Sequence, residues 1–444
     1  MAQGKVKPRT MPGFMELLPS EQILFNKMYD TIREVYESFG FLPLDTPVLE
    51  LAEVLLAKAG GETEKQIYRF TKGDTDMAMR FDLTVPLARY VAQHAGELTF
   101  PFKRYQMSKV YRGERPQKGR FREFYQCDID IIGNEELDLV YEAEIPAVIY
   151  NIFKKLDFGK FTIRLNNRKI LNGFFDSLGL GESIADILRT IDKIDKIGAE
   201  KVLAELADFG VSAEAGDKIL SFITAEGTTD EKIAYLKSLG IENETFAQGV
   251  SEIEQVADYM RMFGIDDSYF MLDLTIARGL DYYTGTVYET VLDDYRNLGS
   301  VCSGGRYDNL TGYYTNQKMP GIGISIGLTR LFSQLKEAGI ITAESKSLVK
   351  VLVAPMDCDT GYALKAASAL RQSGIPCEIY YAKKGFKHKM KYADKLGIPF
   401  VAVIGTDEQA NGQVSVKNMT TGEQVTVALE NISDEIKKQM GDLH

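Results

Sequence analysis

The chain has 444 residues, a formal net charge of −11 and 45% hydrophobic residues. This length suggests about three domains, and the composition excludes a globally disordered chain. The acidic total argues against a simple nucleic-acid coat protein, although a local basic patch can still bind phosphate groups.

The four cysteines lie far apart without a C-x-x-C pair. They predict neither a disulfide framework nor a zinc site, and they fit a reducing compartment. The three histidines include no close pair, so we expect no histidine-based metal site. The N-terminal sequence MAQGKVKP lacks the apolar core of a signal peptide, and no apolar run approaches the ~18 residues of a spanning helix. We therefore expect a cytoplasmic protein.

The first predicted element is a helix over residues 20–39, which Ser20 can cap and Gly40 can end. Its apolar residues recur at helical spacing and share one face: Ile23, Leu24, Met28, Ile32, Val35 and Phe39. Residues 41–165 then show short alternating runs with helices between them, which favours a mostly antiparallel sheet.

Residues 168–265 are helical in period, and strand signals are nearly absent there. The strand pattern then returns, so we predict an α+β core (1–167 and 266–341) that a helical insertion interrupts. After the polar join TAESKS, residues 348–444 alternate apolar strands with helix-length segments, which is typical of βαβ units.

The stretch YRGERPQKGRFREFYQCDID, residues 111–130, changes sign along its length. Five cations come first: Arg112, Arg115, Lys118, Arg120 and Arg122. Gln126, Asp128 and Asp130 then follow at every second position, on one face of a predicted strand. We predict a hairpin with Arg112 and Glu114 together on one face of its first strand. It is either an exposed ladder of ion pairs or a site where arginines hold an anion and carboxylates hold an amine.

Two later segments carry unusual polar residues. Arg278 interrupts an apolar strand shortly before Tyr282 and Tyr283, and a buried arginine is costly unless it is paired. That cost favours a functional role over an arginine that reaches solvent from a strand end. In MPGIGISIGLTRL, the isoleucines share one face and the small residues share the other, so a flat group such as a nucleobase could approach the backbone there. Arg330 follows at a predicted helix start, which favours anions.

Motifs of other enzyme classes fit poorly. GISIG matches the hydrolase G-x-S-x-G elbow around Ser325, but only His388 and His444 follow it, both in the predicted third domain. GIGISIG lacks the dinucleotide-binding spacing, and no G-x-x-x-x-G-K-[ST] loop is present.

These segments together resemble the histidyl-tRNA synthetases, a family of class II aminoacyl-tRNA synthetases. GFLPLDTPVLE is similar to the family's first motif, with Pro47 at the dimer interface, and residues 111–130 are similar to the second. GIGISIGLTRL resembles the third and ends in Arg330. RGLDYYTGTVYE and SGGRYDNL resemble two segments peculiar to the histidine enzymes.

The resemblance implies a homodimer with a class II core, a helical insertion and a C-terminal α/β domain that binds the anticodon. It implies that the enzyme activates L-histidine with ATP and Mg²⁺ to histidyl-adenylate and diphosphate. The histidyl group then passes to the 3′ end of tRNA(His). Positioning and charge stabilisation would dominate such catalysis.

The resemblance also implies the roles of particular residues. For ATP these are Arg112 at the α-phosphate, Glu114 at the adenine amino group and Arg330 at the γ-phosphate, with Arg278 and Arg112 as catalytic residues. For histidine they are Asp82, Thr84 and Gln126 at the α-amino group and Asp130 and Tyr283 at the imidazole, with Leu83, Arg112, Arg278 and Tyr282 completing the pocket. Asp82 and Asp130 stand where the bacterial type often has glutamate, so each acceptor is one methylene shorter.

For tRNA, residues 383–395 combine six lysines with one acidic residue. This segment is either a solvated helix face or a surface for tRNA, and the resemblance favours tRNA. It implicates Lys383, Lys384 and Lys387 there, and Arg115 and Gln117 at the acceptor end.

Two non-catalytic relatives are alternatives. The regulatory subunit of ATP phosphoribosyltransferase shares the core, but it usually lacks the C-terminal domain and degrades the catalytic segments. A pseudo-synthetase domain of a stress kinase requires a kinase signature, which the sequence lacks. The chain keeps Arg112, Arg278 and Arg330, so the sequence favours an active synthetase.

Overall fold

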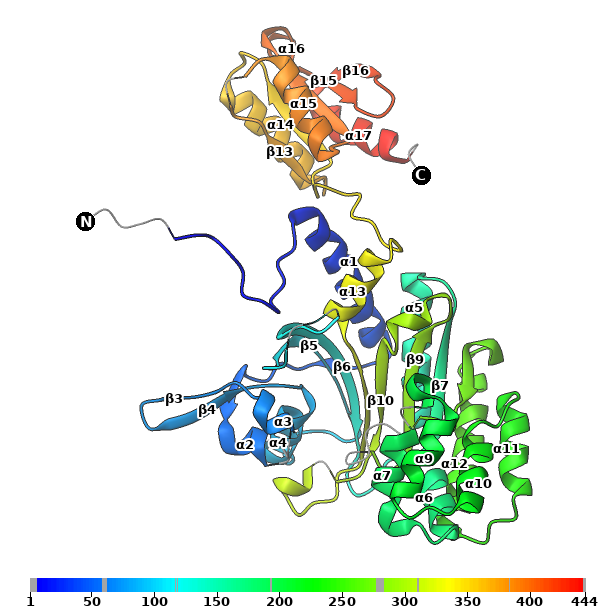
Figure 1. The fold of residues 1–444 in the computed structure, drawn as a ribbon. Helices are drawn as coiled ribbons and strands as arrows, with labels where there is room; N and C mark the ends of the chain where they lie inside the picture. Colours follow the sequence, from blue (N-terminus) through cyan, green and yellow to red (C-terminus); the bar gives the residue numbers. More distant parts are fainter. Residues whose placement is uncertain are drawn as a thin grey trace. The chain divides into compact units, whose positions relative to one another are not determined.

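The structure, a computed structural model, describes residues 6–57, 62–115, 117, 119–191, 194–276, 283–309, 311–382 and 384–441. Its backbone contacts divide the chain into two compact units. One unit comprises the residues up to Met15 together with Met28–Ile340, and the other comprises Glu16–Lys27 together with the residues from Ile341 onward. The ribbon in Figure 1 labels many of the elements of both units.

The large sheet of the first unit is built from β1 (Leu42–Pro43), β5 (Phe102–Tyr111), β6 (Glu123–Ile132), β7 (Phe161–Asn167), β8 (Phe270–Leu272), β9 (Thr286–Leu292), β10 (Cys302–Tyr307) and β11 (Gly321–Ile326). In the described part of the chain these eight strands have the order β1-β5-β6-β11-β10-β9-β7-β8. Only the outer pairs β1–β5 and β7–β8 are parallel among them. The prediction of a mostly antiparallel sheet is confirmed.

Helix α1 (Pro19–Ser38) packs against this sheet through its second half. Met28, Ile32 and Val35 are buried, and the Tyr36 hydroxyl donates to the carbonyl oxygen of Cys127 in β6 at 2.9 Å. The helix begins one residue before Ser20, because proline suits a first helical position that needs no N–H. Gly40, at φ +79°, ends the helix as predicted.

Helices α5 (Tyr141–Leu156) and α13 (Leu328–Glu337) belong to the same unit. The Tyr288 hydroxyl of β9 donates to the Glu142 carbonyl oxygen of α5. A small sheet has the strand order β2 (Leu49–Leu51), β4 (Thr75–Met79) and β3 (Arg69–Lys72). Along the chain, α2 (Ala52–Leu56) and α3 (Glu62–Gln66) come between β2 and β3, and α4 (Thr84–His94) follows β4.

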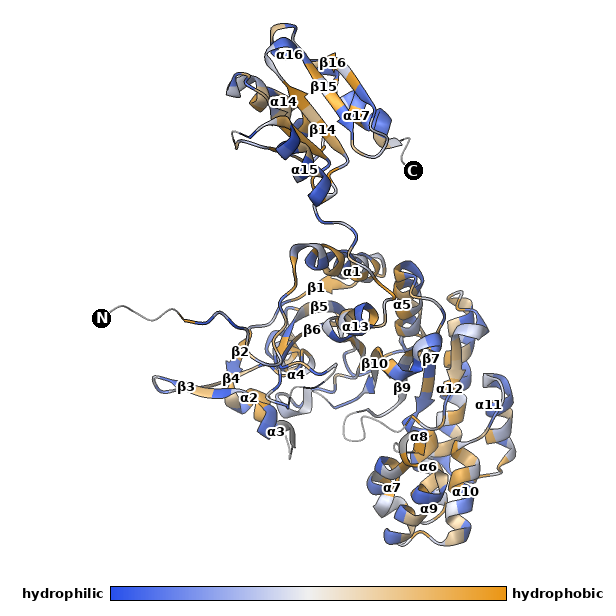
Figure 2. Ribbon diagram, turned by 45° about the horizontal axis from the view of Figure 1, so that its top comes forward, coloured by the Kyte–Doolittle hydropathy of each residue, from blue (hydrophilic) through white to orange (hydrophobic). Residues whose placement is uncertain are grey.

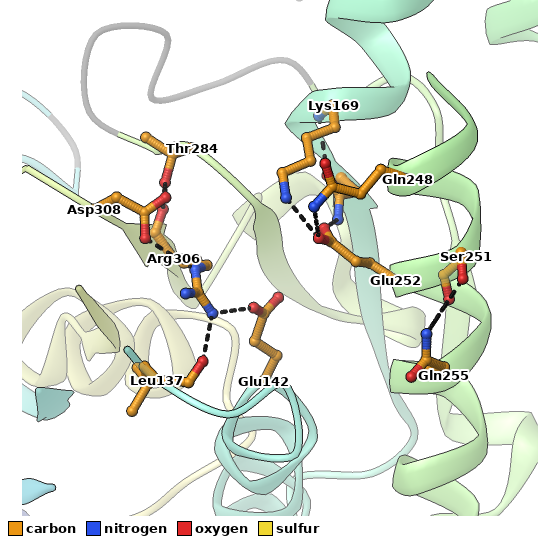
Figure 3. A network of polar contacts seen from close by, with 11 residues as sticks. Leu137, Glu142, Lys169, Gln248, Ser251, Glu252, Gln255, Thr284, Arg306 and Asp308 are labelled. Carbon is orange, nitrogen blue, oxygen red and sulfur yellow. Dashed lines mark hydrogen bonds and ion pairs between the residues drawn. The ribbon is translucent and has the colours of Figure 1, made fainter. Parts of the chain in front are cut away.

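The described residues between β7 and β8 form helices joined by short loops and include no strand. Its helices are α6 (Arg168–Ser177), α7 (Ile184–Ile191), α8 (Ile194–Ile197), α9 (Ala199–Asp208), α10 (Ala213–Ile223), α11 (Thr229–Ser238) and α12 (Glu244–Met262). Helices α6 and α12 approach closely at Gly173, where an added Cβ would lie 2.5 Å from the backbone nitrogen of Phe246. Glu252 of α12 also accepts a hydrogen bond from Lys169 at 2.5 Å (Figure 3). It accepts a second one from Asn167 at 3.0 Å.

The second unit contains a sheet with the order β13-β12-β14-β15-β16 among its described residues. The strands are β12 (Val351–Pro355), β13 (Cys377–Ile379), β14 (Phe400–Ile404), β15 (Gln413–Asn418) and β16 (Gln424–Ala428), and the helices are α14 (Thr360–Gln372), α15 (Phe386–Leu396), α16 (Thr406–Ala410) and α17 (Ile432–Gly441). The first three strands are parallel, as predicted, and β15 and β16 add an antiparallel pair. Figure 2 shows the apolar residues that fill the central strand β14.

Candidate active site

The candidate site is built on the central strand β6. Cys127, Ile129 and Ile131 are buried in the core, whereas the residues between them, Asp128 and Asp130, line a pocket. Strand β11 runs beside β6, with Ser325 opposite Asp128 and Gly323 opposite Asp130. The alternation therefore places the acidic residues on one face of the sheet, as the sequence predicted.

The bare face of β11 is filled by protein side chains at two of its glycines. A Cβ on Gly323 would lie 2.2 Å from Oδ1 of Asp130, and a Cβ on Gly321 would lie 2.3 Å from the Tyr307 ring. The expectation that a nucleobase could lie against this face is therefore wrong at Gly321 and Gly323. These glycines make room for the neighbouring side chains instead.

Asp130 is held by two buried partners. Its Oδ2 pairs with Nη2 of Arg104 at 2.5 Å, and its Oδ1 accepts a hydrogen bond from the Tyr307 hydroxyl at 2.7 Å. Arg104, on β5, is fully buried and also contacts the Leu83 carbonyl oxygen at 3.4 Å. Burial raises the pKa of Asp130 to about 6, although Arg104 and the Tyr307 hydroxyl favour its ionised form.

Asp128 is buried as deeply but is held by fewer groups. Burial raises its pKa to about 7, while Arg104 and the Ser325 hydroxyl lower it and the charges of Asp130 and Asp82 raise it. The amide nitrogen of Gln126 donates to the same Ser325 hydroxyl at 2.8 Å. Among the described residues, neither Oε1 of Gln126 nor Oδ1 of Asp128 has a hydrogen-bond partner.

A small pocket of about 40 Å³ lies over these residues. Its walls are formed by Thr84, Asp128, Asp130, Tyr283, Ser303, Tyr307, Gly323, Ile324 and Ser325. Burial, together with the charges of Asp130 and Asp128, raises the pKa of the Tyr283 phenol, so the hydroxyl stays protonated and can donate.

A larger cavity of about 480 Å³ contains Arg112, Glu114 and Arg330 in its walls, and it shares Ser303 and Ser325 with the small pocket. Nε of Arg112 donates to the Phe81 carbonyl oxygen at 3.0 Å, and its guanidinium lies 5.0 Å from the centre of the Phe124 ring. Arg330 is the third residue of α13 and donates to the Leu298 carbonyl oxygen at 3.0 Å.

Arg112 and Glu114 do not lie on a strand, so the predicted strand face is wrong. Strand β5 ends at Tyr111, because the Gly113 N–H bonds to the Gln66 carbonyl oxygen at 2.6 Å and turns the chain away. Both side chains nevertheless line the larger cavity. Glu114 accepts from Arg120 there, at 3.3 Å between the two side chains.

The remaining predicted residues are distributed as follows. Asp82 accepts the Val85 N–H at 3.0 Å near the start of α4, Leu83 is buried beside it, and Thr84 reaches the small pocket. Arg115 and Gln117 are exposed in the β5–β6 connection, and Lys384 and Lys387 are exposed in the second unit. Arg278, Tyr282 and Lys383 lie outside the described residues.

Four residues of the site were not predicted as ligand-binding or catalytic groups: Arg104, Ser303, Tyr307 and Ser325. A signal for Arg104 exists, because it interrupts a buried run of β5. Ser325 was weighed as a hydrolase nucleophile, but it lies inside β11 and its hydroxyl is engaged with Gln126 and Asp128. It therefore does not occupy the strand-to-helix turn that such a nucleophile requires.

Hydrogen bonds between described residues hold both flanks of the segment that contains Arg278; we call this set of bonds the clamp. On one side, Asn166 donates to the Ile276 carbonyl oxygen at 3.1 Å. On the other, the Thr284 hydroxyl donates to Asp308 at 2.6 Å, and Asp308 also accepts from Arg306 at 3.1 Å. Arg306 continues to Glu142 at 2.8 Å (Figure 3). The clamp ties both flanks to the sheet and to α5.

Comparison with known proteins identifies the family. A model of the histidyl-tRNA synthetase family matches residues 13–331, and a model of an anticodon-binding domain matches residues 350–439. A histidine–tRNA ligase of Clostridium tetani is 59% identical over 97% of this chain and 98% of its own length. The chain belongs to the histidyl-tRNA synthetase family. The resemblance inferred from the sequence motifs is thereby confirmed.

Other members of the histidyl-tRNA synthetase family agree over the full chain. A histidine–tRNA ligase of Xanthomonas campestris is 48% identical over 98% of this chain and 97% of its own length. The crystal structure of a histidyl-tRNA synthetase from Nostoc superposes with a TM-score of 0.91 at 45% identity, covering 98% of this chain and 100% of that one. These likenesses confirm the α+β synthetase fold with an anticodon-binding domain.

A Bacillus halodurans structure titled as an ATP phosphoribosyltransferase regulatory subunit/histidyl-tRNA synthetase is also similar. Its TM-score is 0.72 at 19% identity, over 90% of this chain and 99% of that chain, so it supports the shared fold alone. In the described residues no group of three His, Cys, Asp or Glu side chains is placed to bind a metal ion. The described helices are too short or too polar to span a membrane.

Proposed function

We propose that the chain activates L-histidine with ATP and transfers the histidyl group to the 3′ end of tRNA(His). Membership of the histidyl-tRNA synthetase family supports the overall reaction. The observation that supports this site is the junction of two unlike pockets at Ser303 and Ser325. One pocket is acidic and the other contains arginines, and the amino acid and the nucleotide would meet between them.

The larger cavity suits a nucleoside triphosphate. In this proposal Arg112 binds the α-phosphate, Arg330 binds the γ-phosphate and Glu114 accepts from the adenine amino group. A guanidinium matches phosphate oxygens, and the position of Arg330 in the first turn of α13 adds the favourable end of the helix dipole. Mg²⁺ would enter with ATP and would neutralise part of the phosphate charge.

The small pocket suits histidine. Asp82, Thr84 and Gln126 would bind the α-ammonium group, and Asp130 and Tyr283 would bind the imidazole, with Leu83 and Tyr282 beside them. The free acceptor Oε1 of Gln126 supports a donor-rich ligand at this place. The histidine carboxylate would then point toward Arg112 and the α-phosphate, where Arg278 is proposed to stabilise the charge of the transition state.

Two proposed partners are macromolecular. For tRNA, the exposed Lys384 and Lys387 precede and begin α15, in the part of the chain that matches an anticodon-binding domain. Lys383, Arg115 and Gln117 complete the proposed tRNA contacts. For a second copy of the chain, we propose the face around Pro47. Exposed apolar side chains lie on the neighbouring strands and directly before β2: Leu42, Val48, Leu49, Leu51 and Phe70. We place the enzyme in the cytoplasm.

The decisive experiment is isotope exchange between diphosphate and ATP, followed by charging of tRNA(His). Exchange that depends on L-histidine, and on no other amino acid, is the expected result. A regulatory subunit without synthetase activity would show no exchange. Exchange with histidine but no transfer to tRNA(His) would contradict the second half of the proposal.

A further inference from the structure

We propose that Asp128 is a further histidine-binding residue, whose Oδ1 accepts a hydrogen bond from a ring N–H of the bound imidazole. The inference rests on the proposed function, because it names one more group in the amino-acid pocket. The family resemblance gave the imidazole to Asp130 and Tyr283 only. The contacts of the two aspartates on β6 suggest a different division of work between them.

Asp130 is already engaged through both of its carboxylate oxygens. Arg104 binds Oδ2 at 2.5 Å and the Tyr307 hydroxyl binds Oδ1 at 2.7 Å. The guanidinium compensates the negative charge, and Gly323 leaves just enough room for the carboxylate. A carboxylate oxygen can accept a further hydrogen bond, but both oxygens of Asp130 are already held in place by protein groups at the base of the pocket.

Asp128 offers a carboxylate oxygen that no described residue of the chain uses. Its residue is 2% exposed, and its Oδ1 has no hydrogen-bond partner among the described groups. No described cation forms an ion pair with it within salt-bridge distance. A buried acceptor without a partner is costly and rare in folded proteins. A ligand that supplies the missing N–H group would remove that cost.

Hydrogen bonds through Ser325 fix Asp128 as an acceptor. The Gln126 amide donates to the Ser325 oxygen at 2.8 Å, so the Ser325 hydroxyl proton is available for Asp128. Gln126 thus donates to Ser325, and Ser325 in turn donates to the Asp128 carboxylate. The chain is complete when a donor from the ligand reaches the remaining oxygen, Oδ1.

The pocket favours a ring N–H as that donor. Asp128 shares the small pocket with Tyr283, whereas Gln126 lines the larger cavity. A neutral imidazole has one N–H and one bare nitrogen. Asp128 would accept from the first while the Tyr283 hydroxyl donates to the second. An apolar ring of the same shape would leave Oδ1 of Asp128 without a partner among the described groups, and buried polar sites discriminate strongly in this way.

The test compares wild-type protein with Asp128→Asn, which keeps the volume and removes the charge. Titration calorimetry without ATP measures the Kd of L-histidine and of β-(2-thienyl)alanine, whose ring has no N–H. We expect the Kd of histidine to rise by about 10- to 100-fold, because a ring N–H bonds much less strongly to a neutral amide than to a carboxylate. The Kd of thienylalanine should stay equal in the two proteins.

Two controls isolate the site. The Kd of ATP should be unchanged in Asp128→Asn, which shows that the fold and the larger cavity are intact. Asp76→Asn removes a carboxylate of the β3–β4 hairpin that lines neither pocket. That variant should bind histidine like wild type, so a general effect of reduced acidity is excluded.

Several outcomes would overturn the proposal. An unchanged Kd of histidine, or an equal loss for thienylalanine, would show that Asp128 does not meet the ring N–H. Imidazolepropionate lacks the α-amino group, so if its binding is unaffected by Asp128→Asn, the contact is to the ammonium instead. Wild-type protein that binds no histidine would refute the proposed function as well.

A crystal structure of the wild-type protein with histidine provides a test without any variant. We expect a ring nitrogen within about 3.2 Å of Oδ1 of Asp128, the normal range of such bonds. A separation beyond about 4 Å would reject the assignment even if the variant fails to fold.

Discussion

At the scale of single residues, the pocket concentrates acidic groups that water does not reach. Asp128 and Asp130 are 2% and 3% exposed, and Arg104 is the cation that faces them among the described residues. Such a site is poorly compensated until a ligand with donors enters it. We therefore expect these buried acidic groups to contribute to ligand binding and to lower the stability of the ligand-free fold.

Asp130→Ala should abolish histidine activation while ATP binding remains. The substitution removes a carboxylate from the wall of the pocket. It also leaves Arg104 buried without its ion-pair partner, which in comparable pairs lowers the free energy of unfolding by roughly 3–5 kcal/mol. Histidine-dependent exchange of diphosphate into ATP measures the first effect, and calorimetry with ATP measures the second. Circular dichroism must show a folded variant. Near wild-type exchange would refute the assignment of Asp130 to the pocket.

Asp128 should make the stability of the ligand-free protein depend on pH. Its folded pKa of about 7 lies above the ordinary value near 3.8, so the folded state holds the proton more tightly than the unfolded state. Stability from this group is therefore full below pH ~4 and decreases as the pH rises toward about 7, by up to about 1.4 kcal/mol per pH unit. Above pH 7 this contribution no longer changes.

Asp128→Asn removes that penalty. Denaturant titrations without ligand should show the variant gaining stability over wild type at pH 8, and gaining little at pH 4. An equal difference at both pH values would mean that the carboxylate is not penalised by burial. The same variant is expected to bind histidine more weakly, which is the trade-off usual for functional sites.

At the scale of elements, the periodicity of the sequence predicted the features that depend only on residues close together in the chain. The buried face of α1, the alternation of β6 and the helix start before Arg330 followed from spacing alone. The end of β5 at Tyr111 did not, because it depends on a bond between Gly113 and Gln66 of another element. The partners of Asp130 were also missed, since Arg104 and Tyr307 come from different strands and only the sheet order brings them together.

The packing of α6 against α12 provides a test at this scale. Gly173→Ala would place a methyl group 2.5 Å from the Phe246 backbone nitrogen, and backbone cannot move aside as a flexible side chain can. We expect a loss of about 1–3 kcal/mol in unfolding free energy, typical of overpacking. Gly96→Ala is the matched control, because its Cβ meets nothing within 4 Å. If Gly173→Ala and Gly96→Ala unfold at the same urea concentration, α6 and α12 can move apart to accommodate the methyl group without loss of stability.

At the scale of the whole molecule, the two compact units divide the proposed work. Arg112 and Arg330, which we propose to bind phosphate, belong to the first unit, whereas Lys384 and Lys387 belong to the second. The net charge of −11 makes such local basic groups necessary for contact with tRNA.

Lys384→Glu combined with Lys387→Glu should therefore lower charging of tRNA(His) by roughly tenfold or more at moderate salt, because phosphate contacts dominate affinity. Histidine-dependent exchange of diphosphate should be unchanged. Lys365→Glu, an exposed change on α14 of the same unit, is the control for added negative charge. If the double variant charges tRNA like the control, the lysines do not contact tRNA.

The pairing of β6 with β11 has a consequence for synthesis on the ribosome. Gln126 and Ser325, which bond across this pair, are 199 positions apart in the chain. At roughly 5–20 residues per second, about ten seconds or more separate their emergence. During that time β6 has an open edge and the proposed amino-acid pocket lacks its second wall, while the helical segment between the two strands can fold through local contacts. Free histidine therefore cannot assist the early steps of folding, and the nascent chain depends on the arrival of β11 to protect that edge from other chains.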